Sequence, residues 1–274
     1  MTRPGIRAIL LAPLVLFAIF YLLGVIVVAT DNHSVETAAP QTIKPRHIAI
    51  FGATGTAGDG MLKAALNDNQ IQKIHVITRR STPRIEQGIA AGKAEMTVHQ
   101  DYLDYSEIHE KISAVDTVYW AIGISSVGAE EETYGRIHVE FPLRFLEEWT
   151  SVSDKQDLSF HFISSSDISE DSSTMWVRQK IRAEKSLFGF AEGTNLRVIS
   201  YRPDYIGPTP EQAQLSQELL YWFFRPVGAA VRATEIGKAM LELTARGSTF
   251  ENGTKISTSD IVRYSAAYDR RQHL

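Results

Sequence analysis

The sequence predicts an α/β fold built on a doubly wound parallel sheet, preceded by an N-terminal transmembrane helix. Three observations support this expectation. A wholly apolar run lies near the start of the 274-residue chain, six short apolar segments follow from residue 47 onward, and stretches of helical periodicity separate those segments. Strands that alternate with helices form βαβ units, whose parallel strands are buried on both faces of the sheet.

The composition is that of an ordinary folded protein, with 44% hydrophobic and 22% charged residues. Lys and Arg number 28 against 32 Asp and Glu, and this net charge of -4 argues against a broad nucleic-acid-binding surface. Cysteine is absent, which excludes disulfides, thiolate metal sites, iron–sulfur clusters and cysteine nucleophiles. The 8 histidines show no metal-ligand spacing, so no metal site is expected.

The first expected element is the uncharged run from Ala8 to Ala29. At about 1.5 Å per residue it would be about 33 Å long, enough to cross the hydrocarbon core of a bilayer. We therefore expect residues 1–29 to form a membrane anchor. A cleavable signal peptide is the alternative, with Arg3 and Arg7 as its basic start, although its apolar core would be unusually long.

Residues 30–46 are polar, contain Pro40 and Pro45 and show no periodicity, so they are expected to form a linker. The two arginines before the apolar run weakly favour a cytoplasmic N-terminus, which would place the rest of the chain on the other side of the membrane. Asp31 and Glu36 follow the run, with Lys44 and Arg46 slightly further on, so this charge asymmetry is small. The side of the membrane therefore stays open.

From residue 47 the expected strands are short and rich in β-branched or aromatic residues. They cover 47–53, 73–79, 94–100, 117–123, 158–164 and 196–202. Helix-like stretches lie between them at 59–68, 106–112, 131–150 and 174–190. Residues 47–203 are accordingly expected to form one Rossmann-like core.

A glycine-rich turn joins the first expected strand to the first expected helix. Gly52-Ala53-Thr54-Gly55-Thr56-Ala57-Gly58 has the spacing G-x-x-G-x-x-G. Glycines allow a tight turn and a close approach to a pyrophosphate, and the N-terminus of the following helix offers free N–H groups. Because the pattern lies between a strand and a helix, it predicts a dinucleotide site, with a plain strand–helix turn as the alternative. The predicted contacts are Gly52, Thr54, Gly55, Thr56, Ala57 and Gly58.

The end of the second expected strand indicates which dinucleotide is bound. An acidic residue there would hydrogen-bond the ribose hydroxyls of NAD, and none is present. Arg79 and Arg80 stand there instead, and arginine forks match the oxygens of a 2′-phosphate. NADP is therefore the expected cofactor of residues 47–203, with a solvated basic turn as the alternative for the two arginines.

Two further strand ends complete the expected cofactor site. Asp101 and Tyr102 follow the third strand, where they would border the adenine. Ala121 and Gly123 follow the fourth strand, where small residues would let the cofactor pass over the end of the strand.

Together these residues resemble the short-chain dehydrogenase/reductase superfamily over roughly residues 47–245, most closely its atypical branch of Tat-interacting oxidoreductase-like proteins and small bacterial NAD(P)-binding proteins. The matching stretches are FGATGTAG, VITRR, QDYLD, VYWAIGIS, FISSSD and SYRPDYIGP. The resemblance implies a Rossmann fold that binds NADP(H), with Arg202 and Pro203 of the last stretch near the cofactor. It also implies catalysis by a Ser, a Tyr and a Lys, with the Tyr and Lys four residues apart on one helix face.

The resemblance breaks at the catalytic tyrosine. Lys180 matches the lysine position and would hold the ribose, and Ser165, with Ser166 next, matches the serine. The tyrosine position holds Trp176, whose indole N–H cannot act as a general acid near neutral pH. The groups that could supply the proton instead are Tyr134, Tyr205, His138 or a water molecule. A reaction that needs no such acid and a protein that binds NADP without turnover both stay open.

Residues 204–274 are expected to complete the same domain as a lid or substrate region, with an amphipathic helix at 234–245. The apolar stretch 219–224 favours a lipophilic substrate, and a docking face against the anchor or a bilayer is an equal alternative. The leading hypothesis is a membrane-anchored NADP-dependent reductase of a lipophilic carbonyl or enone-like molecule. The alternatives are an NADP-binding regulatory or scaffold protein and an isomerase or cyclase; the oligomeric state stays open.

Overall fold

The computed structural model describes residues 6–37 and 46–273, with side chains from residue 13 onward. Its centre is a seven-stranded sheet of order β3-β2-β1-β4-β5-β6-β9, in which all neighbouring strands are parallel. The strands are β1 (Arg46–Phe51), β2 (Ile71–Thr78), β3 (Ala94–Val98), β4 (Thr117–Trp120), β5 (Leu158–Ile163), β6 (Leu196–Arg202) and β9 (Thr254–Ser257). The predicted doubly wound parallel sheet is confirmed. Its order reverses between β1 and β4, where sheets of this kind bind ligands.

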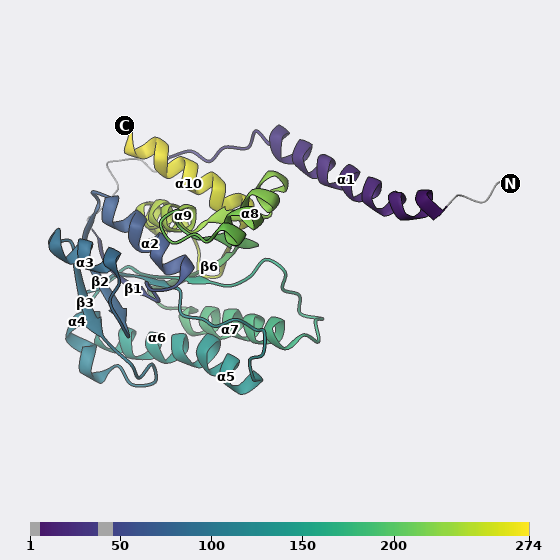
Figure 1. The fold of residues 1–274 in the computed structure, drawn as a ribbon. Helices are drawn as coiled ribbons and strands as arrows, with labels where there is room; N and C mark the ends of the chain where they lie inside the picture. The colour runs from purple at the N-terminus through teal and green to yellow at the C-terminus, as the bar shows by residue number, and fades with distance from the viewer. Residues whose placement is uncertain (1–5, 38–45, 274) are drawn as a thin grey trace.

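Helices cover both faces of the sheet, which is why its strands are continuous apolar runs (Figure 1). One face carries α2 (Thr56–Asn67), α9 (Ala233–Arg246) and α10 (Thr258–Gln272). Glycine lets α2 and α9 approach closely, because a Cβ on Gly60 would lie only 2.1 Å from the carbonyl carbon of Ala233. This packing holds the N-terminal turn of α2, and with it the glycine-rich loop, firmly against the sheet.

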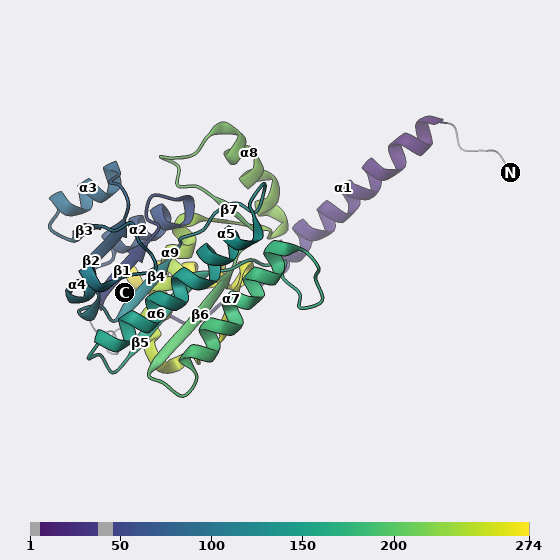
Figure 2. The ribbon, with the colours of Figure 1, turned by 90° about the horizontal axis from the view of Figure 1, so that it is seen from below.

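The opposite face carries α6 (Phe141–Val152) and α7 (Met175–Ala191), with the short helices η2 (Ser106–Ile108) and α4 (His109–Ser113) beside them (Figure 2). Its core is aromatic. The ring of Phe51 in β1 lies 4.7 Å from that of Phe145 and 4.6 Å from that of Trp120. These contacts fix the carboxyl ends of β1 and β4 beside each other.

The structure differs from the predicted helices and strands in two places. The helix expected over 131–150 is three segments, because the π-helix η3 (Arg136–Glu140) separates α5 (Glu131–Gly135) from α6. Several elements were not predicted, among them α3 (Pro83–Ala90), β9 and the fifteen-residue helix α10. In β9 only Ile256 is buried, so its four residues lack an apolar pattern that could mark a strand, and pairing with β6 defines it.

The N-terminal element α1 (Ile6–Thr30) extends away from the rest of the molecule (Figure 1). Residues 13–30 of this helix are long and apolar enough to cross a membrane, and none of that stretch is buried. A signal sequence has the same properties, so the anchor and the signal peptide both stay predictions. Arg3 lies outside the described residues.

The described part of the predicted linker packs against the domain. Residues 31–37 run along α10, where Arg263 forms a 2.6 Å ion pair with Asp31 and Arg270 donates to the carbonyl of Val35 at 2.6 Å. Arg46 belongs to β1, so the linker is shorter than predicted at that end. Pro40 and Pro45 lie outside the described residues.

Residues 205–232 form a small lobe that follows the carboxyl end of β6. It comprises the parallel pair β7 (Tyr205–Gly207) and β8 (Ala230–Arg232), the helix α8 (Leu215–Phe224) and the 3-10 helix η4 (Arg225–Val227). The fully buried carboxylate of Asp59 in α2 joins this lobe to the sheet, because it accepts hydrogen bonds from Thr209 and Arg84, both at 2.6 Å. The predicted lid region thus sits at the same end of the sheet as the glycine-rich turn.

Candidate functional site

The glycine-rich turn between β1 and α2, here called the glycine cradle, packs so tightly that side chains at Gly52 and Gly58 would collide with the backbone. Gly52 has φ 76°, and a Cβ there would lie 2.7 Å from the carbonyl of Ala121 at the end of β4. A Cβ on Gly58 would lie 2.1 Å from the carbonyl oxygen of Gly52. Gly55 is the N-cap of α2 and gives it no side-chain cap, so the first N–H groups of the helix face the turn unblocked. This arrangement suits a phosphate group at the helix N-terminus.

A groove of about 390 Å³ opens beside this turn, over the ends of β1, β2 and β4. The predicted residues that line it are Gly52, Thr54, Gly55, Arg79, Tyr102, Ala121 and Gly123. A second hollow of about 440 Å³ adjoins it and is lined by Thr54, Arg79, Arg80 and Gln100. The groove thus lies where the strand order reverses, and residues from four separate strand ends meet there.

Arg79 and Arg80 are exposed at the end of β2. Among the residues that the structure describes, neither guanidinium lies within ion-pair distance of a carboxylate. The turn that carries them is fixed locally, because Thr78 Oγ1 donates to the carbonyl of Arg80 at 3.1 Å. Two unpaired guanidinium groups on a fixed turn form a site suited to an anion such as phosphate.

Tyr102 and Asp101 follow β3 but play different roles. Tyr102 is buried, with its ring 5.5 Å from that of Phe141, and burial raises its pKa. Asp101 is exposed and does not line the groove, since its carboxylate accepts a hydrogen bond from the backbone N–H of Leu103 at 3.0 Å. The structure therefore brings Tyr102 to the groove and uses Asp101 to close the adjoining turn.

Lys180 lies in α7 next to the end of β5. Its side chain is buried, and its Nζ donates to the carbonyl of Ile163 at 3.1 Å. Burial lowers the pKa of Lys180 to about 8, against the opposing effect of the Glu184 carboxylate. Trp176, one helical turn earlier, is half-buried. The structure thus places a lysine with an unusually acidic ammonium group beside the serines that end β5.

The three serines after β5 differ in their surroundings. Ser164 is buried and its backbone N–H donates to the carbonyl of Tyr201 at 2.7 Å, while the Ser166 hydroxyl donates to Asp204 at 2.5 Å. Ser165 lies between them and is half-buried. Because Ser166 is bound to a carboxylate, Ser165 is the better placed of the two predicted serines to donate to a ligand.

α5 and the π-helix η3 bring Tyr134 and His138, respectively, close to the groove. Their rings lie 4.1 Å apart, and a Cβ on Gly123 would lie 2.7 Å from the His138 ring, so these side chains back the end of β4. Burial and the nearby charge of Lys180 lower the pKa of His138 to about 3, and burial raises that of Tyr134 to about 12. Neither is therefore poised to exchange a proton near neutral pH. π-helices are common at functional sites.

Arg202 and Pro203 do not line the groove. Arg202 forms a bidentate ion pair with Glu184, with its Nε 2.8 Å from the carboxylate, and the Ser200 hydroxyl donates to the same group at 2.7 Å. Burial would raise the pKa of Glu184, but these hydrogen bonds lower it. The structure therefore commits Arg202 to a buried carboxylate rather than to the groove, a partnership that the sequence pattern did not reveal.

The remaining predicted residues are distributed as follows. Thr56, Ala57 and Gly58 form the first turn of α2, and their side chains do not line the groove. Tyr205 lies in the lobe, where its hydroxyl donates to the carbonyl of Gln217 at 3.2 Å. Lining residues that the sequence analysis missed are Thr78, Gln100, Ile122, Ile124, Thr133, Arg136, Ile137 and Phe141. Position after a strand could have indicated Gln100, whereas the residues of α5, η3 and α6 reach the groove only through the tertiary fold.

No protein-family model matches the chain. The chain is 28% identical over 178 residues to the leucinostatins biosynthesis cluster protein T of Purpureocillium lilacinum, a match that covers 64% of this chain and 62% of that protein. The match thus spans less than two thirds of that relative's length.

Several solved structures share the fold. A 3-oxoacyl-[acyl-carrier protein] reductase from Brucella melitensis has a TM-score of 0.59 and 17% identity, over 79% of this chain and 97% of that chain. A UDP-glucuronic acid 4-epimerase from Bacillus cereus, solved with NAD, has a TM-score of 0.59 and 14% identity over 77% of both chains. A short chain dehydrogenase/reductase from Saccharomyces cerevisiae has a TM-score of 0.59 and 12% identity, over 78% of this chain and 96% of that chain. The chain therefore has the Rossmann-type α/β fold that these structures share.

Proposed function

We propose that this chain is an NADP(H)-dependent oxidoreductase of the short-chain type, held at a membrane by α1. The single observation that carries the proposal is the tight glycine turn at the end of β1, which leaves the uncapped N-terminus of α2 open to the groove. The fold shared with reductases and with NAD-bound epimerases supports a nicotinamide dinucleotide as that ligand.

Each part of the groove suits one part of the dinucleotide. The N-terminus of α2 would hold the pyrophosphate, and Arg79 and Arg80 the 2′-phosphate of NADP(H). Tyr102 would border the adenine, and Lys180 would hold the ribose near the nicotinamide. Bound there, the cofactor would supply a hydride, which the protein itself cannot provide.

Lys180 is our candidate for the proton donor that Trp176 cannot be. Its pKa of about 8 lies close to physiological pH, which is where a general acid works best. Ser165 would donate a hydrogen bond to the substrate carbonyl and so hold it beside the ammonium group. Reduction would then leave Lys180 neutral and the carbonyl oxygen protonated, and solvent would restore the lysine proton.

The substrate class follows from the lobe that follows β6. α8 exposes five large apolar side chains and lies at the edge of the sheet that carries the groove. This surface, together with the apolar α1, favours a lipophilic carbonyl or enone-like substrate. A protein that binds NADP without turnover is the second candidate, which the tryptophan at position 176 favours.

NADPH consumption by the full chain distinguishes these candidates. We expect oxidation of NADPH with carbonyl substrates, at an efficiency that increases with the length of their alkyl chain. A Lys180→Met variant should lose this activity, while Lys185→Met, which changes an exposed lysine in the same helix, should keep it. Binding of NADPH without its consumption by any of these carbonyl substrates would contradict the proposed oxidoreductase activity and support the binding protein.

A further inference from the structure

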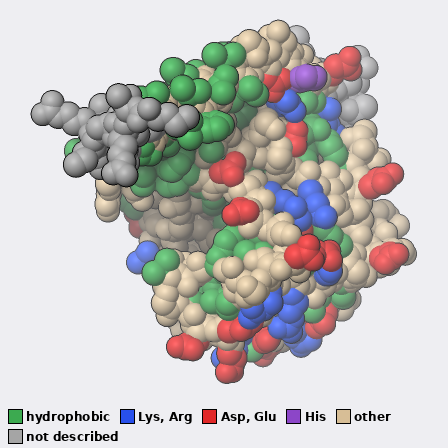
Figure 3. Space-filling view, turned by 90° about the vertical axis from the view of Figure 1, so that its right-hand side faces the viewer, with side chains coloured by type: hydrophobic (Ala, Val, Ile, Leu, Met, Phe, Trp, Pro, Cys, Tyr) green, Lys and Arg blue, Asp and Glu red, His purple; other side chains and the backbone are tan. Residues whose placement is uncertain are grey.

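The helix α8 carries an apolar surface that neither the core nor the groove uses. Its exposed side chains are Leu215, Leu219, Leu220, Trp222 and Phe223, of which Leu219 and Trp222 are each 63% exposed. Apolar patches of this kind are uncommon on surfaces that face only water. Figure 3 shows that hydrophobic side chains gather on the side of the molecule from which α1 projects.

α1 and the end of the lobe are packed against each other. The Tyr21 hydroxyl donates to the carbonyl of Phe223 at 2.9 Å, and the Phe17 ring stacks on that of Phe223 with centroids 6.3 Å apart. Val227 of η4 would lie 3.2 Å from a Cβ on Gly24, so a glycine permits that close approach. The contact therefore runs along one stripe of α1.

This stripe fixes how deep α8 would lie if α1 spans a bilayer. Val28 meets Gly228 at the end of the stripe nearest the domain, and Phe17 is at the other end. At about 1.5 Å per residue the stripe is about 16 Å long, roughly half of the hydrocarbon core. The end of α8 could not then remain in water, because Phe223 lies level with Phe17 and Tyr21.

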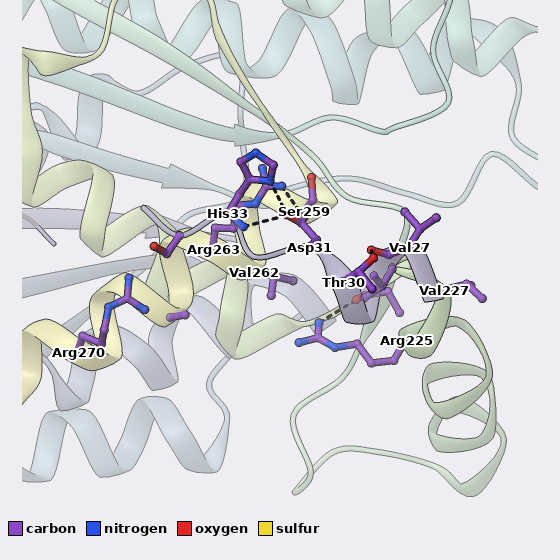
Figure 4. A pocket seen from close by; sticks show the side chains of 15 residues that line it. Val27, Thr30, Asp31, His33, Arg225, Val227, Ser259, Val262, Arg263 and Arg270 are labelled. Carbon is purple, nitrogen blue, oxygen red and sulfur yellow. Dashed lines mark hydrogen bonds and ion pairs between the residues drawn. The ribbon is translucent and has the colours of Figure 1, made fainter. Parts of the chain in front are cut away.

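Further contacts join the end of α1 to the domain. Residues of α1, η4 and α10 line a pocket of about 840 Å³ where α1 ends (Figure 4). Arg263 of α10 pairs across this pocket with Asp31, the residue directly after α1, at 2.6 Å, and the Tyr21 hydroxyl holds the other part of the stripe against Phe223. α1 is thus tied to the domain at both ends of the stripe.

The charges of the segment are also compatible with lipid. Residues 215–227 contain two charged side chains, Glu218 and Arg225. Glu218 pairs with Arg232 at 2.5 Å, and Arg225 pairs with Glu235 at 2.6 Å. Paired charges are far less costly to remove from water than isolated ones.

We infer that α8 and η4 insert into the domain-side leaflet of a lipid bilayer beside α1, with the exposed apolar side chains of α8 against the acyl chains. The inference rests on the proposed anchoring by α1. It deepens the proposed function, because α8 follows β7 at the carboxyl end of β6 and would bring the substrate edge of the sheet to the membrane. A lipophilic substrate would then reach the site from the bilayer rather than from water.

The absence of cysteine allows a direct test with single spin labels in the full chain, reconstituted in phosphatidylcholine vesicles. Leu219→Cys reports on α8, and Ile19→Cys, 48% exposed, reports on α1. Val98→Cys in β3 is the matched control, because its native side chain is 56% exposed. The measured quantity is the ratio of each label's accessibility to oxygen to its accessibility to a water-soluble nickel chelate.

We expect this ratio at positions 219 and 19 to exceed that at position 98 by about fivefold or more, since the polar chelate is excluded from hydrocarbon. A high, lipid-like ratio at position 19 with a low, water-like ratio at position 219 would overturn the insertion of α8 and leave the anchor intact. A low, water-like ratio at position 19 with a high, lipid-like ratio at position 219 would overturn the anchor and with it the insertion beside α1, and would leave only a contact of α8 with lipid. Low, water-like ratios at positions 19 and 219 would overturn both the anchor and the insertion of α8. Shielding of position 219 from both oxygen and the nickel chelate would indicate a protein partner and contradict the inference.

Discussion

Two regions at the carboxyl ends of the strands, the groove beside the glycine-rich turn and the end of β5 beside α7, differ in how strictly their geometry is determined. On the cofactor side, the Gly52 turn meets the backbone of Ala121 so closely that no other residue fits. On the proton-transfer side, Lys180 and Ser165 are placed by the fold, but Trp176 takes the position where the resemblance implies a tyrosine. The first region is determined by backbone contacts, and the second by the chemistry of a few side chains. Dinucleotide binding can therefore be retained while the route of the proton changes.

The largest effect is expected at the glycine cradle. Gly52→Ala should lower NADPH affinity by about a hundredfold or more, because its Cβ pushes the turn away from β4 and disturbs the phosphate site. Gly92→Ala is the matched control, since Gly92 also has positive φ (71°) but open space around its Cβ. It should lose about 1–2 kcal/mol of unfolding free energy and keep its affinity. Thermal unfolding measures the stability, and NADPH titration measures the affinity. Equal NADPH affinities of Gly52→Ala and the wild type would contradict a phosphate site at the glycine-rich turn.

The next effect concerns the choice of dinucleotide. Replacing Arg79 and Arg80 together with Ala should weaken NADPH binding by about 10- to 100-fold, since charge-assisted hydrogen bonds to the 2′-phosphate are lost. NADH binding should not change. Arg144→Ala is the control, because that exposed arginine lies on α6 and pairs with Glu147. An equal loss for NADH and NADPH would show that these arginines do not read the 2′-phosphate.

Lys180 should produce opposite pH dependences of stability and rate. Its pKa is lowered to about 8 in the folded protein and is about 10.4 when unfolded, so the unfolded chain binds more protons between these values. The unfolding free energy should therefore rise as pH increases from about 8 to about 10. Chemical denaturation of wild type, Lys180→Met and Lys185→Met checks this, and only Lys180→Met should lose the increase.

The rate of NADPH oxidation should fall over the same pH range, because the protonated lysine is consumed as the acid. The rate could instead stay constant through pH 8 while the unfolding free energy still shows the Lys180 titration. That result would show that Lys180 is buried but does not donate the proton.

The smallest effect is expected at position 176. Trp176→Tyr restores a hydroxyl one turn before Lys180 and should raise the reductase rate by about tenfold, since a second acid adds to one that already works. Trp176→Phe, which offers no hydroxyl, should leave the rate unchanged. A higher reductase rate in Trp176→Phe would show that the effect comes from the smaller side chain rather than from a proton donor.

The sequence predicted the parts of the molecule in which local pattern determines structure. The glycine spacing, the apolar strands and the arginines at the end of β2 all follow from neighbouring residues, and the sheet that they predicted is confirmed. Residues brought together by distant packing were not predictable in the same way. The pairing of Arg202 with Glu184 and the contact of Phe141 with the groove depend on the tertiary fold.

The same limit applies to the C-terminal part and to η3. The hydrogen bonds of a π-helix span one residue more than those of an α-helix, and the apolar pattern of 131–150 does not reveal this difference, so that stretch was predicted as one helix. The stripe that joins α1 to Phe223 connects residues about two hundred positions apart, and no local pattern could reveal it.

Titration of the full chain in detergent with NADPH and with NADH, followed by the fluorescence of the reduced cofactor, tests the central claim most directly. The account predicts saturable binding of NADPH, at least about tenfold tighter than that of NADH. Binding of neither dinucleotide would contradict the groove as a cofactor site and with it the proposed function.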